Sequence, residues 1–213
     1  MTREEKIEAL EEIALEVRAF KGLEIARHAT NAVPGEGDPD AEIMFIGEAP
    51  GFNEDKQGRP FVGQAGKLLE KSLQESLGMN RDDVYITNIV KYRPPDNRDP
   101  FPDEIEVCRD WLDRQIRVIS PKIIATLGRF SMGKFIEGLT ISRVHGQPRF
   151  VDFAGSRYIV YPMYHPAAAL RAGSVLEQFR QDFNKLKALF TSASSPATAP
   201  DQSPSGPSQG SLF

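Results

Sequence analysis

The sequence predicts an α/β fold, a three-layer α/β/α sandwich with a central, mainly parallel four-stranded sheet. Four apolar runs rich in β-branched residues carry this prediction, and helical patterns separate them along the chain. The runs are continuously apolar rather than alternating, which is typical of strands buried on both faces of a parallel sheet. They cover residues 42–46, 84–90, 122–127 and 158–162.

The helices are predicted from apolar residues at helical spacing. An amphipathic helix with an acidic outer face covers residues 4–18. A helix around 68–77 follows the first strand, and one over 105–119 follows the second, with Pro102 and Asp103 as its start signal. Two further helices are predicted over 129–136 and 176–189, and a hairpin is expected over 141–153.

The composition predicts one soluble domain followed by a tail. Apolar residues make up 40% of the 213 residues and charged residues 26%, as in globular proteins. We place the domain at residues 1–190, with the acidic helix at its start. Residues 191–213 are nearly all Ser, Pro, Ala, Gly and Thr, which cannot bury enough apolar surface to fold, so a disordered tail is expected there.

The cysteine content and the start of the chain predict the compartment. The single cysteine, Cys108, excludes an intramolecular disulfide and an all-cysteine metal site within one chain. The charged start lacks the apolar stretch of a signal peptide, and no run approaches the roughly 20 apolar residues of a membrane span. We therefore expect a reduced, cytoplasmic setting without membrane contact.

The net charge neither excludes nor favours nucleic acid as a partner. The chain carries −4 in total, but residues 1–16 alone carry −4 and residues after 190 carry −1, which leaves +1 on the rest. Basic residues in that part are grouped, for example at Lys91 and Arg93. Ordinary solvated faces explain such groups equally well.

Chemistry-bearing residues lie at the end of every predicted strand, at the edge where ligands bind in open parallel sheets. They are Glu48, Glu54 and Phe61 in the glycine-rich stretch 47–66 after the first strand, then Asn88, Gly128 and His165 at the ends of the others. Each has a structural alternative, because strand-end asparagines often cap turns and phenylalanines usually pack in cores. Their shared location favours a site.

These residue types suit cleavage of an N-glycosidic bond with a flipped base. Asn88 can read a base edge with its donor and acceptor, and Phe61 can stack on the base. His165 can donate to a carbonyl oxygen that gains negative charge as the base leaves. Glu48 or Glu54 can position a water and offset positive charge on the sugar.

The alternative interpretation of residues 63–67 is a phosphate-binding loop. The spacing of the glycines and the lysine does not match that motif, and Leu68 stands where a serine or threonine should hold magnesium.

Three stretches resemble the signature regions of family 4 uracil-DNA glycosylases, part of the wider uracil-DNA glycosylase superfamily. They read GEAPGFNEDKQGRPFVGQAG, VYITNIVKYRPPDNR and YHPAAALR, and the similarity covers roughly residues 20–190. The resemblance implies that the backbone near Glu48 and Ala49 binds uracil and the catalytic water. It also implies that Phe61 stacks on uracil, that Asn88 reads its edge and that His165 stabilises the departing uracil anion.

The resemblance also implies a difference in water activation. The superfamily's best-known members activate water with an aspartate at the position where this chain has Ala49. Family 4 lacks this aspartate too. Glu54 matches an acidic residue of the family's site, so Glu48, Glu54 and backbone carbonyls would share the task.

The chain departs from family 4 at the four cysteines that hold an iron–sulfur cluster in that family. Phe20 and Leu23 stand in place of the early pair, Tyr92 in place of the third, and Cys108 alone remains. One thiolate cannot hold such a cluster, so we expect no metal and no cofactor. Phe20, Leu23 and Tyr92 are expected to form an apolar plug beside Cys108.

Contacts to DNA are expected around the rim of this site. The candidates are Lys91, Arg93, Gly128, Pro166, Leu170 and Arg171. Leu170 or Arg171 would act as the wedge that keeps a flipped base out of the duplex, with simple packing of Leu170 as the alternative. Residues 91–101 lack the histidine through which a related branch bonds covalently to DNA, so ordinary turnover is expected.

The last five residues, QGSLF, resemble the peptide with which bacterial replication and repair proteins bind the sliding clamp. Gln209, Leu212 and Phe213 would be its anchors, presented by a polar tether. A chance match is the alternative.

The sequence thus predicts a monomeric, monofunctional uracil-DNA glycosylase of base excision repair that acts on uracil-containing DNA in the cytoplasm, in association with the nucleoid. Two alternatives stay open: a non-catalytic binder of damaged DNA and a glycosylase for another deaminated base.

Overall fold

Four parallel strands form the centre of the sheet, as the sequence predicts. The computed structural model describes residues 1–194. The strands are β2 (Ile43–Gly47), β3 (Tyr85–Asn88), β4 (Ile123–Leu127) and β6 (Ser156–Met163). All residues of β2, β3 and β4 are buried, which agrees with their continuously apolar sequences.

Within residues 1–194, two antiparallel edge strands extend the sheet to six strands in the order β1-β3-β2-β4-β6-β5. Strand β1 (Glu36–Gly37) pairs with β3, and β5 (Arg149–Phe153) pairs with β6. The predicted count of four strands is therefore corrected to six. The expected hairpin over 141–153 is also wrong, because this stretch begins with helix α7 (Ile141–Val144) and its strand pairs with the residues that follow.

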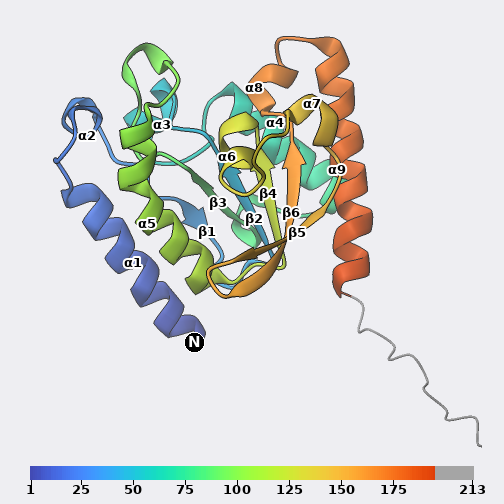
Figure 1. Ribbon diagram of the computed structural model, residues 1–213, viewed down its shortest axis with the longest axis horizontal. Coiled ribbons are helices and arrows are strands. Elements are labelled where there is room, and N and C mark those ends of the chain that lie inside the picture. Colours follow the sequence, from blue (N-terminus) through green and yellow to red (C-terminus); the bar gives the residue numbers. More distant parts are fainter. Residues whose placement is uncertain (195–213) are drawn as a thin grey trace, which may run out of the picture.

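Helices cover both faces of the sheet (Figure 1). Helices α1 (Arg3–Ala19), α5 (Pro102–Ile119) and α6 (Arg129–Gly133) cover one face. Helix α4 (Gln64–Ser72), the π-helical turn Leu73–Leu77 that continues it, and α9 (Gly173–Ser194) cover the other. Because α9 runs to Ser194, the helical part of the chain continues past the predicted domain boundary at 190.

Each of the four parallel strands contributes side chains to two separate cores, because successive side chains point to opposite faces. In β2, Met44 and Ile46 pack in the core beneath α1 and α5, whereas Ile43 and Phe45 pack in the core beneath α4 and α9. The sheet is thus the middle of three layers. No helix among the described residues has the length and apolar character needed to cross a membrane.

The order of the strands places a crevice at the carboxyl end of β2. The chain passes from β2 to β3 on one side and then returns to β4 on the other side. Ligands of open α/β sheets bind at such a reversal. Three short helices lie in the connections around this edge: α2 (Glu24–His28), α3 (Phe52–Gln57) and α8 (Pro166–Ala169). The 3₁₀ turn Pro95–Asn97 follows β3 at this edge, whereas the 3₁₀ turn Arg81–Asp83 precedes β3.

Candidate active site

A cleft of about 540 Å³ lies at the carboxyl ends of the four parallel strands. Residues after β2, β3, β4 and β6 all contribute to its wall. A single cleft therefore brings together residues that lie between Glu48 and Arg171 in the sequence. Its walls include Glu48, Ala49, Glu54, Phe61, Asn88, Asp99, Gly128, Arg129, Tyr164, His165 and Arg171.

Gly47, the last residue of β2, allows an amide and an aromatic ring to meet inside this cleft. It pairs in register with Asn88, the last residue of β3. A Cβ atom on Gly47 would lie 2.3 Å from Asn88 Oδ1 and 2.5 Å from Phe61 Cζ. Since real Cβ atoms do not approach other atoms so closely, only glycine fits between them.

The carboxamide of Asn88 is buried at the wall of the cleft and is suited to bind a ligand. The residue is 1% exposed, and its Oδ1 has no hydrogen-bond partner among the described residues. A buried polar atom without a partner costs free energy, so such an atom at a cleft wall is suited to a polar group that enters the cleft.

Phe61 is held in place through its backbone. Its φ of 51° is unusual for a residue other than glycine, and its carbonyl oxygen accepts a hydrogen bond from Arg81 Nη1 at 2.9 Å. Arg81 is fixed in turn by Glu36, at 2.5 Å. Gly66 packs against the backbone of Phe61 so closely that a Cβ on Gly66 would lie 1.8 Å from the carbonyl oxygen of Phe61. The ring is therefore a rigid wall of the cleft.

The two carboxylates of the cleft have different surroundings. Glu54 Oε1 accepts hydrogen bonds from the amides of Val62 and Gly63, both at 2.8 Å, and so braces the segment that carries Phe61. Glu48 is half-buried, and burial, supported by nearby Asp99, raises the pKa of its carboxyl despite the opposing charge of Arg129.

His165 stands at the cleft as a neutral imidazole. Its Nδ1 accepts a hydrogen bond from the amide of Ala167 at 3.1 Å, which assigns the ring proton to Nε2. Burial, with a contribution from Arg171, lowers the pKa of the imidazole to about 4, although Glu54 opposes this shift. Above pH 5, His165 can therefore donate one hydrogen bond through Nε2 without carrying charge.

The structure brings most of the residues expected from the sequence together. Glu48, Ala49, Glu54, Phe61, Asn88, Gly128, His165 and Arg171 all line the cleft. Leu170 lies next to Arg171 and is 50% exposed. Gln209, Leu212 and Phe213 lie outside the described residues.

Three expected DNA contacts lie elsewhere. Lys91 is 0% exposed, so the expectation that it contacts DNA is wrong. Pro166 is buried as the first residue of α8 and is not part of the cleft wall. Arg93 lies beside the cleft rather than in it, with its guanidinium 5.2 Å from the ring centre of Phe52 and a hydrogen bond to Asn97.

The cleft also contains charged residues that were not expected there from the sequence. Arg98 and Arg129 both line it, paired with Glu104 and Asp99 respectively. Arg129 directly follows Gly128 at the end of β4. This position after a predicted strand could have indicated that Arg129 lines the cleft.

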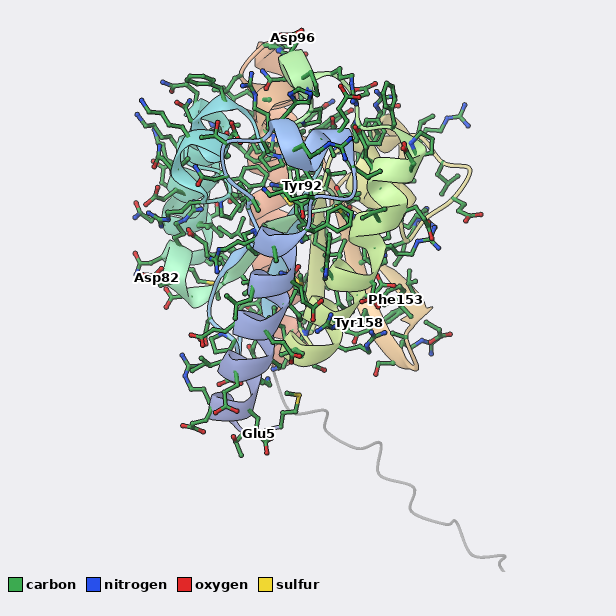
Figure 2. All side chains as sticks on the ribbon, turned by 90° about the vertical axis from the view of Figure 1, so that its left-hand side faces the viewer. Glu5, Asp82, Tyr92, Asp96, Phe153 and Tyr158 are labelled. Atoms are coloured by element: carbon green, nitrogen blue, oxygen red, sulfur yellow. The ribbon has the colours of Figure 1, made fainter. Side chains whose placement is uncertain are left out.

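The positions that correspond to the family's cluster ligands do not fit an iron–sulfur cluster. Phe20 and Tyr92 have ring centres 6.2 Å apart, and the Tyr92 hydroxyl donates to the carbonyl oxygen of Val17 at 2.6 Å. Figure 2 shows Tyr92 near the end of α1 that leads to α2. Burial raises the pKa of the Cys108 thiol to about 11, and no group of three or more metal-binding side chains occurs within residues 1–194.

Comparison with known proteins defines the class first. The family described as the Uracil DNA glycosylase superfamily matches residues 34–187, which is more than half of the chain. The type-4 uracil-DNA glycosylase of Sulfurisphaera tokodaii is 50% identical over 190 residues, 86% of this chain and 86% of that protein. The type-4 enzyme of Saccharolobus solfataricus is 48% identical, over 86% of this chain and 87% of that protein. That of Archaeoglobus fulgidus is 46% identical, over 86% and 94%. The chain belongs to the type-4 uracil-DNA glycosylase family.

Proposed function

We infer that this chain is a uracil-DNA glycosylase, which binds uracil-containing DNA and hydrolyses the bond between uracil and deoxyribose to leave an abasic site. Family membership supports this inference. The observation that carries it in this chain is that two groups line one cleft: the Asn88 Oδ1, which has no hydrogen-bond partner within residues 1–194, and the neutral His165 imidazole.

Recognition of the base is assigned to Asn88 and Phe61. The amide of Asn88 can accept from the N3–H of uracil through Oδ1 and donate to a carbonyl through its NH₂. Cytosine has no N–H at this ring position, so it would leave the buried oxygen unpaired. The fixed ring of Phe61 offers the flipped base a stacking surface.

Departure of the base is assigned to His165. As the C1′–N1 bond breaks, its electron pair moves onto the uracil ring, and negative charge develops on the ring carbonyl oxygens. The Nε2–H of His165 can donate to one of these oxygens. A neutral donor serves here over a wide pH range, because the imidazole does not need to gain or lose a proton before the reaction.

Attack by water is assigned to the carboxylate side of the cleft. Positive charge on the sugar would be offset by Glu48 and Glu54, and water would add to C1′ and lose one proton, which balances the negative charge of the released uracil. The two amide hydrogen bonds to Glu54 keep its carboxylate in a fixed position. Glu48 and the backbone at Ala49 remain available to position the water.

The proposed DNA contacts surround the opening of the cleft. Leu170 is the better candidate for the wedge, because it is half-exposed directly beside the cleft residue Arg171. Arg93 lies on the adjoining surface.

Excision assays on defined oligonucleotides test this function. Labelled strands with uracil, hypoxanthine or mismatched thymine are incubated with the protein in EDTA, and abasic sites are then cleaved with alkali. We expect breaks at uracil, and a loss of about 100-fold or more in Asn88→Ala and His165→Asn. Phe150→Ala is the matched control, because Phe150 lies on edge strand β5 and is 71% exposed.

The same assay separates the alternatives. Binding of uracil-containing DNA without breaks would indicate a non-catalytic binder, and breaks only at hypoxanthine or thymine would indicate another base specificity.

We also propose that the C-terminal peptide binds a sliding clamp and that the chain acts as a cytoplasmic monomer. Deletion of Phe213 should abolish clamp binding in a pull-down while excision on short oligonucleotides stays unchanged. Equal binding with and without Phe213 would refute the clamp proposal. Light scattering of the full chain measures its oligomeric state.

A further inference from the structure

A fully enclosed lysine lies directly behind the base-reading asparagine. The ammonium of Lys91 has three N–H donors, and three oxygens receive them: Thr87 Oγ1 at 2.6 Å, Gln115 Oε1 at 2.7 Å and the carbonyl oxygen of Asn88 at 2.9 Å. Lys91 is 0% exposed, and none of these partners is a carboxylate. The charge is thus stabilised by neutral oxygens alone.

The acceptors of Lys91 are themselves fixed by a second set of buried hydrogen bonds. Gln115, on α5, donates to the carbonyl oxygen of Pro34 at 2.9 Å and contacts the hydroxyl of Tyr85 at 3.3 Å. Thr87 donates to the same Pro34 oxygen at 2.8 Å. The network therefore joins α5, the end of β3 and the segment before β1 into one unit around the ammonium.

This network includes the backbone carbonyl of Asn88, and that backbone sets the direction of the Asn88 side chain. The Asn88 Oδ1 has no partner that would orient it among the described residues. The direction of its side chain is therefore set by its own backbone at the end of β3, where Lys91 holds the carbonyl oxygen. The next residue, Ile89, is held by Gly47, whose carbonyl oxygen accepts from its amide at 3.0 Å.

We propose that Lys91 is a positioning residue for uracil recognition: its ammonium holds the backbone of Asn88 so that the carboxamide faces the base. The proposal rests on the role assigned to Asn88 above. Burial of a charge without a carboxylate partner costs several kcal/mol, whereas a methionine of similar length would fill the same space without this cost. Positioning of the amide is the function that the charge performs.

The protonation state of Lys91 gives this role a pH dependence. Burial lowers the pKa of the ammonium to about 7; Cys108, on α5, opposes this shift and Lys134, on α6, supports it. Loss of one proton leaves two N–H donors for three oxygens. Cys108, with a pKa of about 11, and Tyr85, whose pKa burial also raises, keep their protons over the same range.

A double-mutant cycle with Lys91→Met and Asn88→Ala tests the proposal, with Lys187→Met on α9 as an exposed-lysine control. We expect Lys91→Met to lower kcat/KM for uracil excision by about tenfold or more, because small misplacements of a positioning group cost up to about 100-fold. In the Asn88→Ala background the same change should cost less than about twofold, since coupled residues are not additive. Equal losses in both backgrounds, or no loss in either, would overturn the proposal.

The pH profile provides a measurement that needs no substitution at Lys91. The ratio of kcat/KM between the unaltered chain and Asn88→Ala should fall as the pH rises from 6 to 8.5. If Lys91→Met does not fold, a flat ratio over this range overturns the proposal. Full activity in Asn88→Ala would overturn the assignment of Asn88 itself, whereas a loss in Asn88→Ala without a loss in Lys91→Met would overturn the Lys91 proposal alone.

Discussion

Replacement of His165 by asparagine should remove part of the acid sensitivity of this fold. The pKa of the imidazole is about 4 in the folded protein and 6.5 in an exposed chain. Between these values the unfolded chain binds a proton that the folded chain does not bind. Stability therefore falls as the pH falls through this window.

The size of the effect follows from the two pKa values. The two pKa values differ by about 2.5, and a difference of one corresponds to about 1.4 kcal/mol, so the full contribution is about 3.5 kcal/mol. At pH 4.5, where most of the folded protein still holds a neutral imidazole, about 2 kcal/mol of this should already be lost relative to pH 7. Asparagine suits the test because its Oδ1 can still accept from the Ala167 amide, as Nδ1 does now.

Urea unfolding at pH 7.0 and pH 4.5 measures this difference. The unaltered protein should lose about 2 kcal/mol more than His165→Asn between the two values. His28→Asn is the control, because it makes the same replacement at a histidine whose side chain is 66% exposed. The same loss in His165→Asn and in the unaltered protein would show that His165 is not a buried neutral imidazole, and the assigned role of Nε2–H would lose its basis.

Two further substitutions test the cleft and the aromatic cluster behind it. Gly47→Ala should lower uracil excision by about 100-fold, because its Cβ would displace Asn88 and Phe61; circular dichroism checks the fold, and normal kcat/KM would contradict the geometry. Tyr92→Phe should lower the free energy of unfolding by about 1–2 kcal/mol, because it leaves the Val17 carbonyl without its donor. Chemical denaturation measures this loss, and an unchanged midpoint would show that the hydrogen bond contributes nothing.

The central part of the fold was predictable because its signals are local. The continuous apolar runs predicted all four parallel strands, and Pro102 marked the start of α5. Edge strands carry weaker signals. Strand β1 has two residues, Glu36 and Gly37, and no apolar pattern, and β5 alternates between half-buried and exposed positions.

Part of the candidate site could be predicted from the sequence, but the residues that hold it in place could not. Asn88 and His165 could be placed at one edge because the carboxyl ends of parallel strands share that edge. The sequence does not distinguish the buried Lys91 from Arg93, two positions later, because both are basic residues that follow a strand. Lys91 turns inward to three buried oxygens, whereas Arg93 lies over the ring of Phe52.

The sequence by itself determined the class of fold and the family, and it pointed to many of the residues that line the cleft, because strand order and motif spacing are properties of the chain. Only the tertiary structure decided which groups are charged, which are paired and which are free to meet a ligand. Those properties depend on burial and on partners distant in the sequence: Lys91 meets Gln115 across 24 positions, and Phe61 is held by Arg81 across 20. Desolvation and hydrogen bonding, which set the protonation of His165 and the open acceptor of Asn88, arise only when these segments pack together.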